Sequence, residues 1–291
     1  MRLTNNLNLP QPIVDAVSRD PYTKGDAHIS VTGLIAPARK RVLEIMHADE
    51  LTEDVSNRLW SLIGQIGHGI LERADVTALT EERLYIKRHG WRISGQFDRY
   101  VLEQGLLQDY KFTTTYTIKD GFKFEWEAQE NLYKLLLETH GYTVKKLQVV
   151  AILRDWQKGK AKHSGDYPQI PVQLIDIPIW PRDRVESYIV ERLTAHGNAQ
   201  HVLPQCTAAE RWATPDTFAV MKVGNTRATS VWLTEDEAHA AIAELQRTKP
   251  GRYSVQRRSG ENKRCQDYCP AAPRCAQWEE LRRVDRIDFA S

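Results

Sequence analysis

The sequence has no long hydrophobic run. No stretch of its 291 residues approaches the ~18 consecutive apolar residues of a membrane-spanning helix. Its opening, MRLTNNLNLPQP, also lacks the apolar centre of a secretory signal peptide. We therefore expect a cytoplasmic protein that does not use a membrane as a partner.

The sequence is also poor in net charge and in cysteine. Its formal net charge is only +2, so any affinity for nucleic acid has to come from local patches. It has 4 cysteines, and in the cytoplasm cysteines are more often metal ligands or free thiols than disulfides. Internal repeats and low-complexity tracts are missing too, while 41% of the residues are hydrophobic. This composition predicts a globular protein of one large or two small domains.

One stretch, residues 92–111, concentrates the residues that can carry chemistry. It reads RISGQFDRYVLEQGLLQDYK, and it alternates apolar and polar residues as two half-buried strands do, with a turn at residues 103–105. A turn there places Asp98 opposite Tyr110, within one residue of register. On the second strand, Asp109 and Lys111 share a face. Asp98, Asp109 and Lys111 are therefore expected to converge.

Two carboxylates beside a lysine suit the hydrolysis of a phosphodiester bond. Carboxylate oxygens hold hard divalent cations, a bound cation activates water, and a lysine stabilises the negative charge that develops during hydrolysis. An aspartate and a lysine separated by one residue are also common on exposed strands. An ordinary surface hairpin is therefore the competing interpretation.

Two helical patterns flank this stretch, and each puts a pair of polar side chains on one helix face. His68 and Glu72 stand four residues apart before it, and Gln129 and Tyr133 stand four residues apart after it. Taken alone, His68 could be a core histidine, Glu72 a surface charge, and the second pair ordinary helix surface. Their position on either side of the Asp98 stretch favours a shared site.

The complete pattern resembles the RecB-type branch of the PD-(D/E)XK nucleases. This branch includes the nuclease domains of RecB and AddB, the CRISPR-associated adaptation nucleases and phage-type exonucleases. The resemblance covers residues 30–155 and rests on four motifs in the family's order: His68-x3-Glu72, Gly95-x2-Asp98, Asp109-x-Lys111 and Gln129-x3-Tyr133.

This resemblance implies a restriction-endonuclease-like α/β fold, with a mixed sheet flanked by helices. It implies a Mg²⁺ or Mn²⁺ site held by His68, Asp98, Asp109 and the Tyr110 carbonyl. It also implies a catalytic set in which Lys111 assists the attacking water, made up of Asp98, Asp109, Lys111, Glu72, Gln129 and Tyr133.

The order of elements follows from the periodicity of the apolar residues. Residues 1–27 are expected to be a loosely packed lead-in, and residues 28–200 the nuclease core. Residues 51–75 predict one long helix with Thr52 as its N-cap. Residues 82–111 predict three antiparallel strands, residues 127–141 a helix, residues 143–156 and 171–180 two strands joined by a loop, and residues 182–197 a helix. The helix over 51–75 is expected to bury a stripe of Val55, Leu59, Leu62, Ile63, Ile66 and Ile70.

The C-terminal part, residues 201–291, has a different pattern. Strands over 218–223 and 227–233, a helix over 234–248 with Thr234 as its N-cap, and a strand over 253–259 predict a small ββαβ module. All the cysteines of the chain flank this module: Cys206 on one side, and Cys265, Cys269 and Cys275 on the other.

These cysteines predict a C-terminal metal centre. The spacing C-x3-C-x5-C, with Pro270 and Pro273 between the ligands, is poor material for a helix or strand and suits thiolates gathered around one centre. The family resemblance implies a [4Fe-4S] cluster held by all the cysteines. This chain departs from the family in its x3 gap, where x2 is usual, and in its fourth cysteine, which follows the core. Tetrahedral zinc is a second interpretation, and thiols without a metal are a third.

Clusters of basic residues mark candidate contacts to DNA. Between Arg247 and Arg264 there are seven lysines and arginines and one acid, Glu261. Clustered cations are typical of phosphate contacts, although a solvated surface is an equally simple explanation. The predicted DNA contacts are Arg39, Lys158, Lys160, Arg257 and Arg258.

Together these features predict a metal-dependent deoxyribonuclease. We expect an exonuclease that acts on DNA ends or single strands in recombination, repair or phage DNA processing, with a recombination or annealing protein as a candidate partner. A structure-specific or CRISPR-adaptation-type endonuclease would use the same chemistry. A catalytically inactive DNA-binding scaffold subunit is the alternative from another class, and the intact set of core residues argues against it.

Overall fold

The computed structural model describes residues 1–19, 23–74, 77–119 and 121–288. Residues 20–22 of the predicted lead-in and 289–291 of the C-terminal part lie outside this description. Its contacts divide the chain into one unit of Met1–Val42 and Thr52–Leu203 and a second unit of Leu43–Leu51 and Pro204–Ser291. Among the described residues, none of the helices combines the length and the apolarity needed to cross a bilayer.

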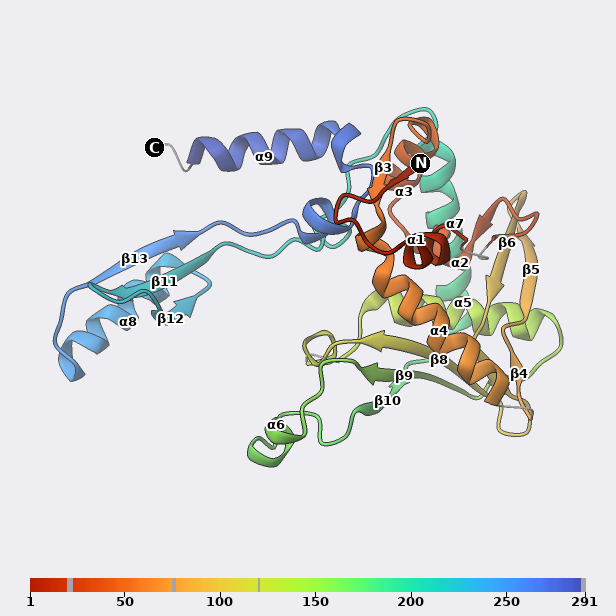
Figure 1. Ribbon diagram of the computed structural model, residues 1–291, viewed down its shortest axis with the longest axis horizontal. Helices are drawn as coiled ribbons and strands as arrows, with labels where there is room; N and C mark the ends of the chain where they lie inside the picture. Colours follow the sequence, from red (N-terminus) through yellow and green to blue (C-terminus); the bar gives the residue numbers. More distant parts are fainter. Residues whose placement is uncertain (20–22, 75–76, 120, 289–291) are drawn as a thin grey trace. The chain divides into compact units, whose positions relative to one another are not determined.

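A five-stranded mixed sheet forms the centre of the first unit (Figure 1), in the order β10-β9-β8-β7-β4. Its strands are β4 (Leu79–Thr80), β7 (Arg99–Val101), β8 (Leu106–Thr113), β9 (Lys146–Leu153) and β10 (Val172–Ile177). β8 and β9 are parallel, and the other neighbours are antiparallel. Because parallel neighbours need a crossover, helix α5 (Phe124–Thr139) joins β8 to β9. The predicted α/β class, a mixed sheet flanked by helices, is confirmed.

The residues on β8 alternate between two helices. Phe112 packs against α4 (Leu59–Ala74), whereas Asp109 and Lys111 face α5. α5 buries a broad apolar face against the sheet, which includes Leu132, Leu136 and Leu137. The predicted helix end at Gly141 is confirmed: this glycine has a φ of 90°, and Tyr142 N–H donates to the Leu137 carbonyl.

A smaller sheet of order β2-β6-β5 holds the hairpin that precedes β7 and β8. Its strands are β2 (Ile29–Ser30), β5 (Arg83–Arg88) and β6 (Trp91–Gln96). The predicted turn at His89 and Gly90 is confirmed, since both have positive φ, as a two-residue type I′ hairpin turn requires. The prediction that residues 82–111 form three antiparallel strands of one sheet is wrong, however. The chain leaves this sheet after Gln96, buries the Phe97 ring against Tyr100, and re-enters the larger sheet as β7.

The long helix predicted over 51–75 is shorter than expected. Thr52–Asp54 form strand β3, Val55–Arg58 form a single 3₁₀ turn, η1, and α4 begins only at Leu59. Thr52 is therefore not the N-cap. Asp54 caps η1 by accepting a hydrogen bond from Ser56 N–H at 3.0 Å. The lead-in is also more ordered than predicted, because β1 (Arg2–Thr4) pairs with β3 and is followed by α1 (Gln11–Ser18).

The predicted core stripe of this helix is mostly wrong. Val55 is fully buried, but Ile63, Ile66 and Ile70 are 42%, 54% and 54% exposed. The reason is that glycine, and not isoleucine, faces the sheet. A Cβ added to Gly67 would lie 1.9 Å from the Phe112 ring. Leu59 and Leu62 are half-buried, so no side chain of α4, all of whose residues are described, is fully buried.

The remaining elements of the first unit complete its layers. α2 (Val31–Ile35) begins at Ser30, whose hydroxyl accepts a hydrogen bond from Gly33 N–H. α3 (Ala38–Met46) follows and belongs to this unit as far as Val42. α7 (Arg182–Asn198) packs against α2 and α5. Residues 158–163, predicted as a loop, form the short helix α6 (Lys158–His163). A single 3₁₀ turn, η2 (Thr115–Ile118), follows β8.

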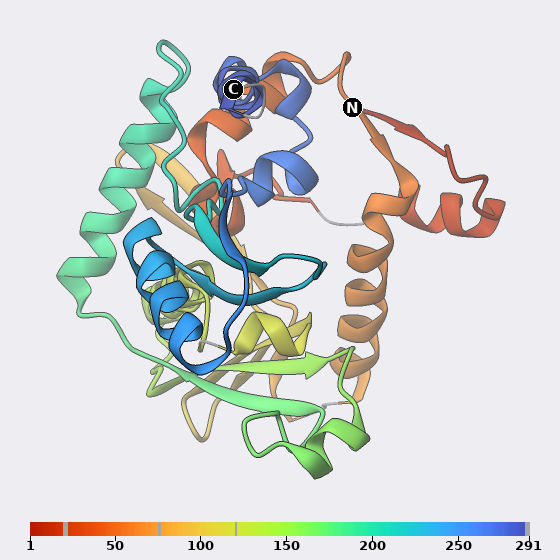
Figure 2. The same ribbon diagram turned by 90° about the vertical axis from the view of Figure 1, so that its left-hand side faces the viewer.

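The second unit contains the predicted ββαβ module. β11 (Thr217–Lys222), β12 (Ala228–Trp232) and β13 (Tyr253–Arg258) make an antiparallel sheet of order β12-β11-β13, and α8 (Glu235–Thr248) packs across it (Figure 2). The predicted N-cap at Thr234 is confirmed within a full capping box to Glu237. The cysteine-rich segment that follows contains η3 (Arg264–Tyr268), η4 (Ala272–Arg274) and α9 (Ala276–Asp288).

Candidate active site

The site forms where β6 ends and β7 begins. Asp98 lies in this break, 9% exposed, and its Oδ2 accepts a hydrogen bond from Tyr110 N–H at 2.6 Å. The pairing of Arg99 with Gln108 in the β7–β8 hairpin puts Asp98 beside Asp109 and Tyr110. The predicted register is thus confirmed within one residue, although the continuous strand predicted through Asp98 is wrong.

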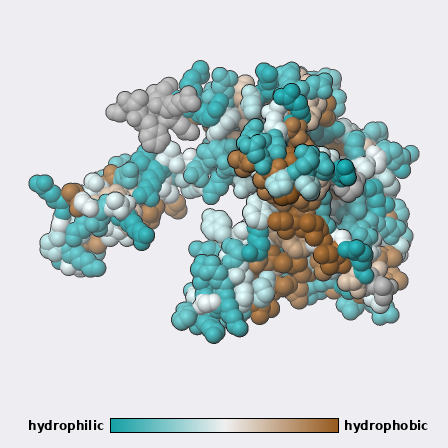
Figure 3. Space-filling view, viewed as in Figure 1, coloured by the Kyte–Doolittle hydropathy of each residue, from teal (hydrophilic) through white to brown (hydrophobic). Residues whose placement is uncertain are grey.

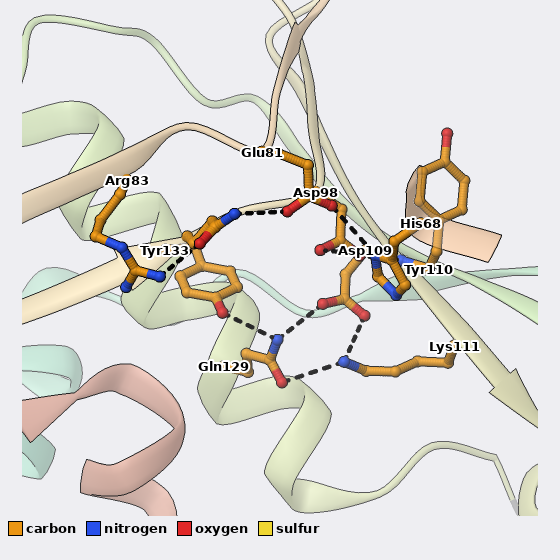
Figure 4. Close-up of polar contacts among 10 residues, drawn as sticks. His68, Glu81, Arg83, Asp98, Asp109, Tyr110, Lys111, Gln129 and Tyr133 are labelled. Atoms are coloured by element: carbon orange, nitrogen blue, oxygen red, sulfur yellow. Dashed lines mark hydrogen bonds and ion pairs between the residues drawn. The ribbon is translucent and has the colours of Figure 1, made fainter. Parts of the chain in front are cut away.

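His68, Glu81 and Asp98 form a cluster beside β8 (Figure 4). His68 Nδ1 lies 3.3 Å from Glu81 Oε1 and 3.5 Å from Asp98 Oδ1. One ligand atom from each residue can be chosen so that all lie within 4.8 Å of one another. The close approach of α4 at Gly67 delivers His68, since the imidazole packs near the Tyr110 and Phe112 rings. We call this group the His68 cluster.

Glu81 was not predicted from the sequence. It lies between β4 and β5 with a φ of 50°, and its own N–H donates to the Asp98 carbonyl at 3.2 Å. Gln96 Nε2 donates to Glu81 Oε2 at 2.9 Å, and Arg83 in turn donates to Gln96. The sequence offered only an adjacent pair of glutamates before a strand, and it gave no reason to prefer Glu81 to Glu82.

Glu72, which was predicted to be catalytic, is not part of this cluster. It lies exposed near the end of α4, four residues after His68. Spacing on a helix does place both residues on one side, but the cluster is completed by a carboxylate from another segment. Glu81 occupies the place beside His68 that the motif assigned to Glu72.

Asp109, Lys111, Gln129 and Tyr133 form a second group on the α5 side of β8 (Figure 4). Lys111 Nζ lies 2.7 Å from Asp109 Oδ2. The Gln129 amide bridges the two, because its Nε2 donates to Asp109 Oδ1 at 2.8 Å and its Oε1 accepts from Lys111 Nζ at 3.3 Å. Tyr133 OH lies 3.3 Å from Gln129 Nε2. We call this set the Lys111 group.

The electrostatics of the His68 cluster favour a positive charge. Burial opposes protonation of His68, but the Asp98 and Glu81 carboxylates outweigh burial and raise its pKa to about 10. A hydrogen-bonded imidazole between two carboxylates therefore takes up a proton when no other cation is present. The same carboxylates would attract a divalent metal ion.

The Lys111 group carries buried charge. Burial, and then the charge of Asp98, raise the pKa of Asp109 to about 6, although Lys111 partly offsets both. Lys111 keeps its proton: burial favours the neutral amine, but Asp109 and Asp98 outweigh it and raise the pKa. Glu130, fully buried on α5, has a pKa well above the usual range because of burial and of the Asp109 charge. Glu130 is therefore a neutral acid behind the group.

The donor atoms of the His68 cluster fit a divalent metal ion. Two carboxylates and an imidazole nitrogen are ligands that Mg²⁺ and Mn²⁺ accept, and the partial exposure of His68 and Glu81 leaves access for water and substrate. Asp109 was predicted to be a metal ligand, but it is turned toward Lys111 and Gln129. Tyr110 contributes its N–H to Asp98, which holds the carboxylate in place.

The predicted DNA contacts fall into three environments. Arg39 is buried and donates to the Leu203 carbonyl, so its side chain does not face solvent as a phosphate contact requires. Lys158 and Lys160 are exposed on α6. Arg257 pairs with Asp216 at 2.7 Å, while Arg258 is exposed on the same strand, β13.

The cysteines all lie in the second unit and are partly buried. Burial raises the pKa of the Cys265 thiol, and the charges of Cys269 and Cys275 raise it further. Gln277 holds the fourth cysteine in place: its side-chain amide accepts from Cys206 N–H and donates to the Cys206 carbonyl, both at 2.9 Å.

Comparisons with known proteins give only distant likenesses. No protein-family model matches the chain, and no curated protein sequence matches it. A crystal structure of SSO0001 is 18% identical, with a TM-score of 0.47, and the match covers 69% of this chain and 87% of that one. A phage-related exonuclease from Haemophilus somnus 129PT is 15% identical, with a TM-score of 0.36, and the match covers 58% of this chain and 91% of that one. Function therefore has to be inferred from the geometry of the site.

Proposed function

We propose that this protein is a metal-dependent deoxyribonuclease that hydrolyses phosphodiester bonds, and that it acts as an exonuclease. One observation carries the proposal: the His68 cluster and the Lys111 group meet at neighbouring residues of β8. A carboxylate site for a cation beside a charged lysine is the combination that phosphodiester hydrolysis needs. The order of these residues also supports it, since it follows the RecB-type motifs.

The metal ion would be Mg²⁺ or Mn²⁺ held by His68, Glu81 and Asp98. The motif also assigns Asp109 and the Tyr110 carbonyl as ligands, and Asp109 would then exchange its contacts with Lys111 and Gln129 for the metal. When bound, such an ion lowers the pKa of water and neutralises charge on the phosphate oxygens. Asp98 is held for this purpose by Tyr110 N–H at 2.6 Å, and Glu81 by Gln96 at 2.9 Å. Both carboxylates are thus oriented before any ligand arrives.

Lys111 is positioned to act on the attacking water and on the phosphate. Its ammonium group is fixed by Asp109 at 2.7 Å and by the Gln129 carbonyl oxygen at 3.3 Å. The remaining donor capacity of the ammonium group can orient water and stabilise negative charge as the phosphate is attacked. Gln129 keeps the amine and the carboxylate in register, and Tyr133 supports Gln129.

We also propose that Cys206, Cys265, Cys269 and Cys275 hold a [4Fe-4S] cluster, with zinc as the alternative metal. The short spacing of Cys265, Cys269 and Cys275 in the chain and the partial burial of these residues support a shared centre. Thiolates are the ligands that both metal centres require. Such a centre would serve structure, since none of the cysteines belongs to the His68 cluster or the Lys111 group.

A cleavage assay on four DNA substrates tests the nuclease proposal. End-labelled linear and closed circular DNA, each single- and double-stranded, would be incubated with Mg²⁺ or Mn²⁺. We expect linear DNA to shorten from its ends while circles stay intact. EDTA should abolish cleavage, and Asp109→Asn should lower its rate at least ~100-fold. Cut circles would identify an endonuclease, and binding without any cleavage would identify an inactive scaffold.

A further inference from the structure

α4 presents an apolar face that the protein does not cover. Trp60, Ile63, Ile66 and Ile70 are 58%, 42%, 54% and 54% exposed, and Figure 3 shows apolar side chains gathered in a brown band over this helix. From Leu59 to Leu71 the helix has no aspartate, glutamate, lysine or arginine. Contiguous apolar surface of this kind marks a binding site more often than chance exposure does.

This face begins beside a stacked pair of side chains. The Arg154 guanidinium lies over the Trp60 ring, 3.7 Å from its centroid. Arg154 follows the last residue of β9, and its N–H donates to the Thr113 carbonyl at the end of β8 at 3.0 Å. Thr113 stands two residues after Lys111 on the same strand. The pair therefore lies at the carboxyl end of the strand that carries the proposed catalytic lysine.

The chain that follows this pair is rich in positive charge. Lys158, Lys160 and Lys162 are on α6, a few residues after Arg154, and Lys158 and Lys160 are exposed. The neighbouring acid, Asp155, is engaged with the Thr115 N–H at 2.7 Å and with the Thr115 hydroxyl at 3.0 Å. Proteins bind single-stranded nucleic acid with this combination: cations contact the phosphates, and aromatic side chains stack on the bases.

We propose that the Trp60–Arg154 pair and the apolar face of α4 bind unpaired bases of single-stranded DNA. Bases would stack on the indole and the guanidinium plane and lie against Ile63, Ile66 and Ile70, while α6 and Arg154 contact phosphates. A duplex hides the faces of its bases within its own stack, so it would gain only the phosphate contacts. The site rests on the proposed function for its substrate, but binding there does not require cleavage.

Fluorescence anisotropy in EDTA tests this site without hydrolysis. The full-length protein would be titrated into a labelled oligothymidylate and into an abasic oligonucleotide of the same length. We expect wild-type protein to prefer the oligothymidylate, because only this probe has bases to stack. Trp60→Ala should weaken binding of the oligothymidylate about tenfold and leave binding of the abasic oligonucleotide unchanged. Trp60→Phe should keep most of the preference, and Arg154→Ala should weaken binding of both probes.

Trp232→Ala is the matched control, since Trp232 is also a partly exposed tryptophan but lies on β12 of the ββαβ module. This variant should bind both probes as wild type does. An unchanged preference in Trp60→Ala protein would overturn the proposal. So would a dimer in light scattering that Ile66→Ser separates, because the face would then bind a second copy of the chain.

The outcome is separable from that of the proposed function. A protein that cleaves none of the four DNA substrates, but needs Trp60 to prefer bases, would keep this site and lose the nuclease assignment. A metal-dependent nuclease whose Trp60→Ala variant still distinguishes the two probes would keep the activity and lose the site.

Discussion

Asp98 links the His68 cluster to the Lys111 group. One oxygen accepts from Tyr110 N–H on β8, and the other lies 3.5 Å from His68 Nδ1 on α4. Burial raises the pKa of Asp109, and the charge of Asp98 raises it further. The Asp98 carboxylate thus lies close to the His68 imidazole of α4, to the Tyr110 backbone amide and to the Asp109 carboxylate.

Glu81, inside the His68 cluster, and Glu72, outside it, give a residue-scale prediction. Glu81→Gln should weaken Mn²⁺ binding and slow cleavage at least ~10-fold. The reason is that the Glu81 carboxylate supplies negative charge to the proposed metal site and helps to orient its ligands. Glu72→Gln removes the same charge from an exposed position on α4, and we expect it to stay within about twofold of wild type. Isothermal titration with Mn²⁺ and single-turnover cleavage would measure both. Equal losses of Mn²⁺ binding and cleavage in the two variants would show that Glu72 also belongs to the active site.

Local spacing explains which site residues were predictable. Asp109 and Lys111 share a strand face, and Gln129 and Tyr133 share a helix face, so periodicity alone put each pair together. Glu81 reaches the site through a residue with φ of 50° and a link to Asp98, 17 positions later in the chain. No short-range pattern encodes that contact.

At the scale of elements, the contact between α4 and β8 decides where His68 lies. Gly67 faces the Phe112 ring so closely that any Cβ would overlap it. The same ring lies 6.0 Å from the imidazole of His68. The isoleucines turn outward as a result, which is why an apolar stripe that predicted a core face instead became surface.

Two glycines on this helix give a matched pair of variants. Gly67→Ala should push α4 or the Phe112 ring aside, displace His68 and slow cleavage by up to ~100-fold, since small displacements of a catalytic group are costly. A Cβ at Gly69 meets nothing within 4 Å. Gly69→Ala should therefore keep activity and gain about 0.5–1 kcal/mol of stability from helix propensity. Rates and thermal melts would check both, and normal cleavage by Gly67→Ala protein would contradict the packing argument.

The start of η1, just before α4, gives a prediction about pH. Hydrogen bonds from Asn6 N–H and from Ser56 lower the pKa of Asp54 from 3.8 to about 2. A carboxylate with a lowered pKa stabilises the fold above its ordinary pKa, and this contribution is lost as the pH falls toward the folded value. Asp54→Asn should therefore melt at a lower temperature than wild type at pH 5–7. The difference should shrink as the pH falls from about 4 to 2, and a constant difference would refute this origin.

The Asn6 contact also shows why the start of the helix was mispredicted. Thr52 and Asp54 are both suitable caps by residue type. Asp54 is selected by partners 48 and 50 positions away, namely Asn6 N–H and the Thr4 hydroxyl. A choice made by long-range contacts cannot be read from the local sequence.

At the scale of the whole molecule, features set by the local sequence were predictable, and features set by long-range contacts were not. The ββαβ module was predictable because its hairpin, capping box and helix are each short-range features. The inclusion of Leu43–Leu51 in the same unit was not, because it depends on contacts such as the 2.7 Å pair of Glu50 with Arg274. The division of the β5–β6 and β7–β8 hairpins between two sheets likewise depends on packing around Phe97 and Tyr100.

The cysteines give the prediction at this scale. Cys206 and Cys265 stand 59 positions apart, and a shared metal centre would close the chain around the module. The entropy estimate for a crosslink of this length is about 4 kcal/mol. Cys206→Ser and Cys275→Ser should each remove visible absorbance, lower the melting temperature and promote aggregation. Asp98→Asn should keep both colour and melting temperature while losing cleavage.

Iron and zinc analysis of anaerobically purified protein, together with absorbance and thermal melts, would check this prediction. Zinc in place of iron would change the metal and keep the crosslink. A colourless, metal-free protein that melts no lower after the cysteines are replaced would rule the centre out.

Gln277 bears on the order in which such a centre would be assembled. Its amide pairs with both backbone groups of Cys206, as a neighbouring strand would, and the Arg211 guanidinium also donates to the Cys206 carbonyl. Neither contact involves sulfur. The segment that holds the most distant cysteine is thus positioned by amide and guanidinium groups that contact its backbone. If the proposed centre forms, we expect its removal to leave this segment attached, because Gln277 and Arg211 hold the Cys206 backbone and not its sulfur.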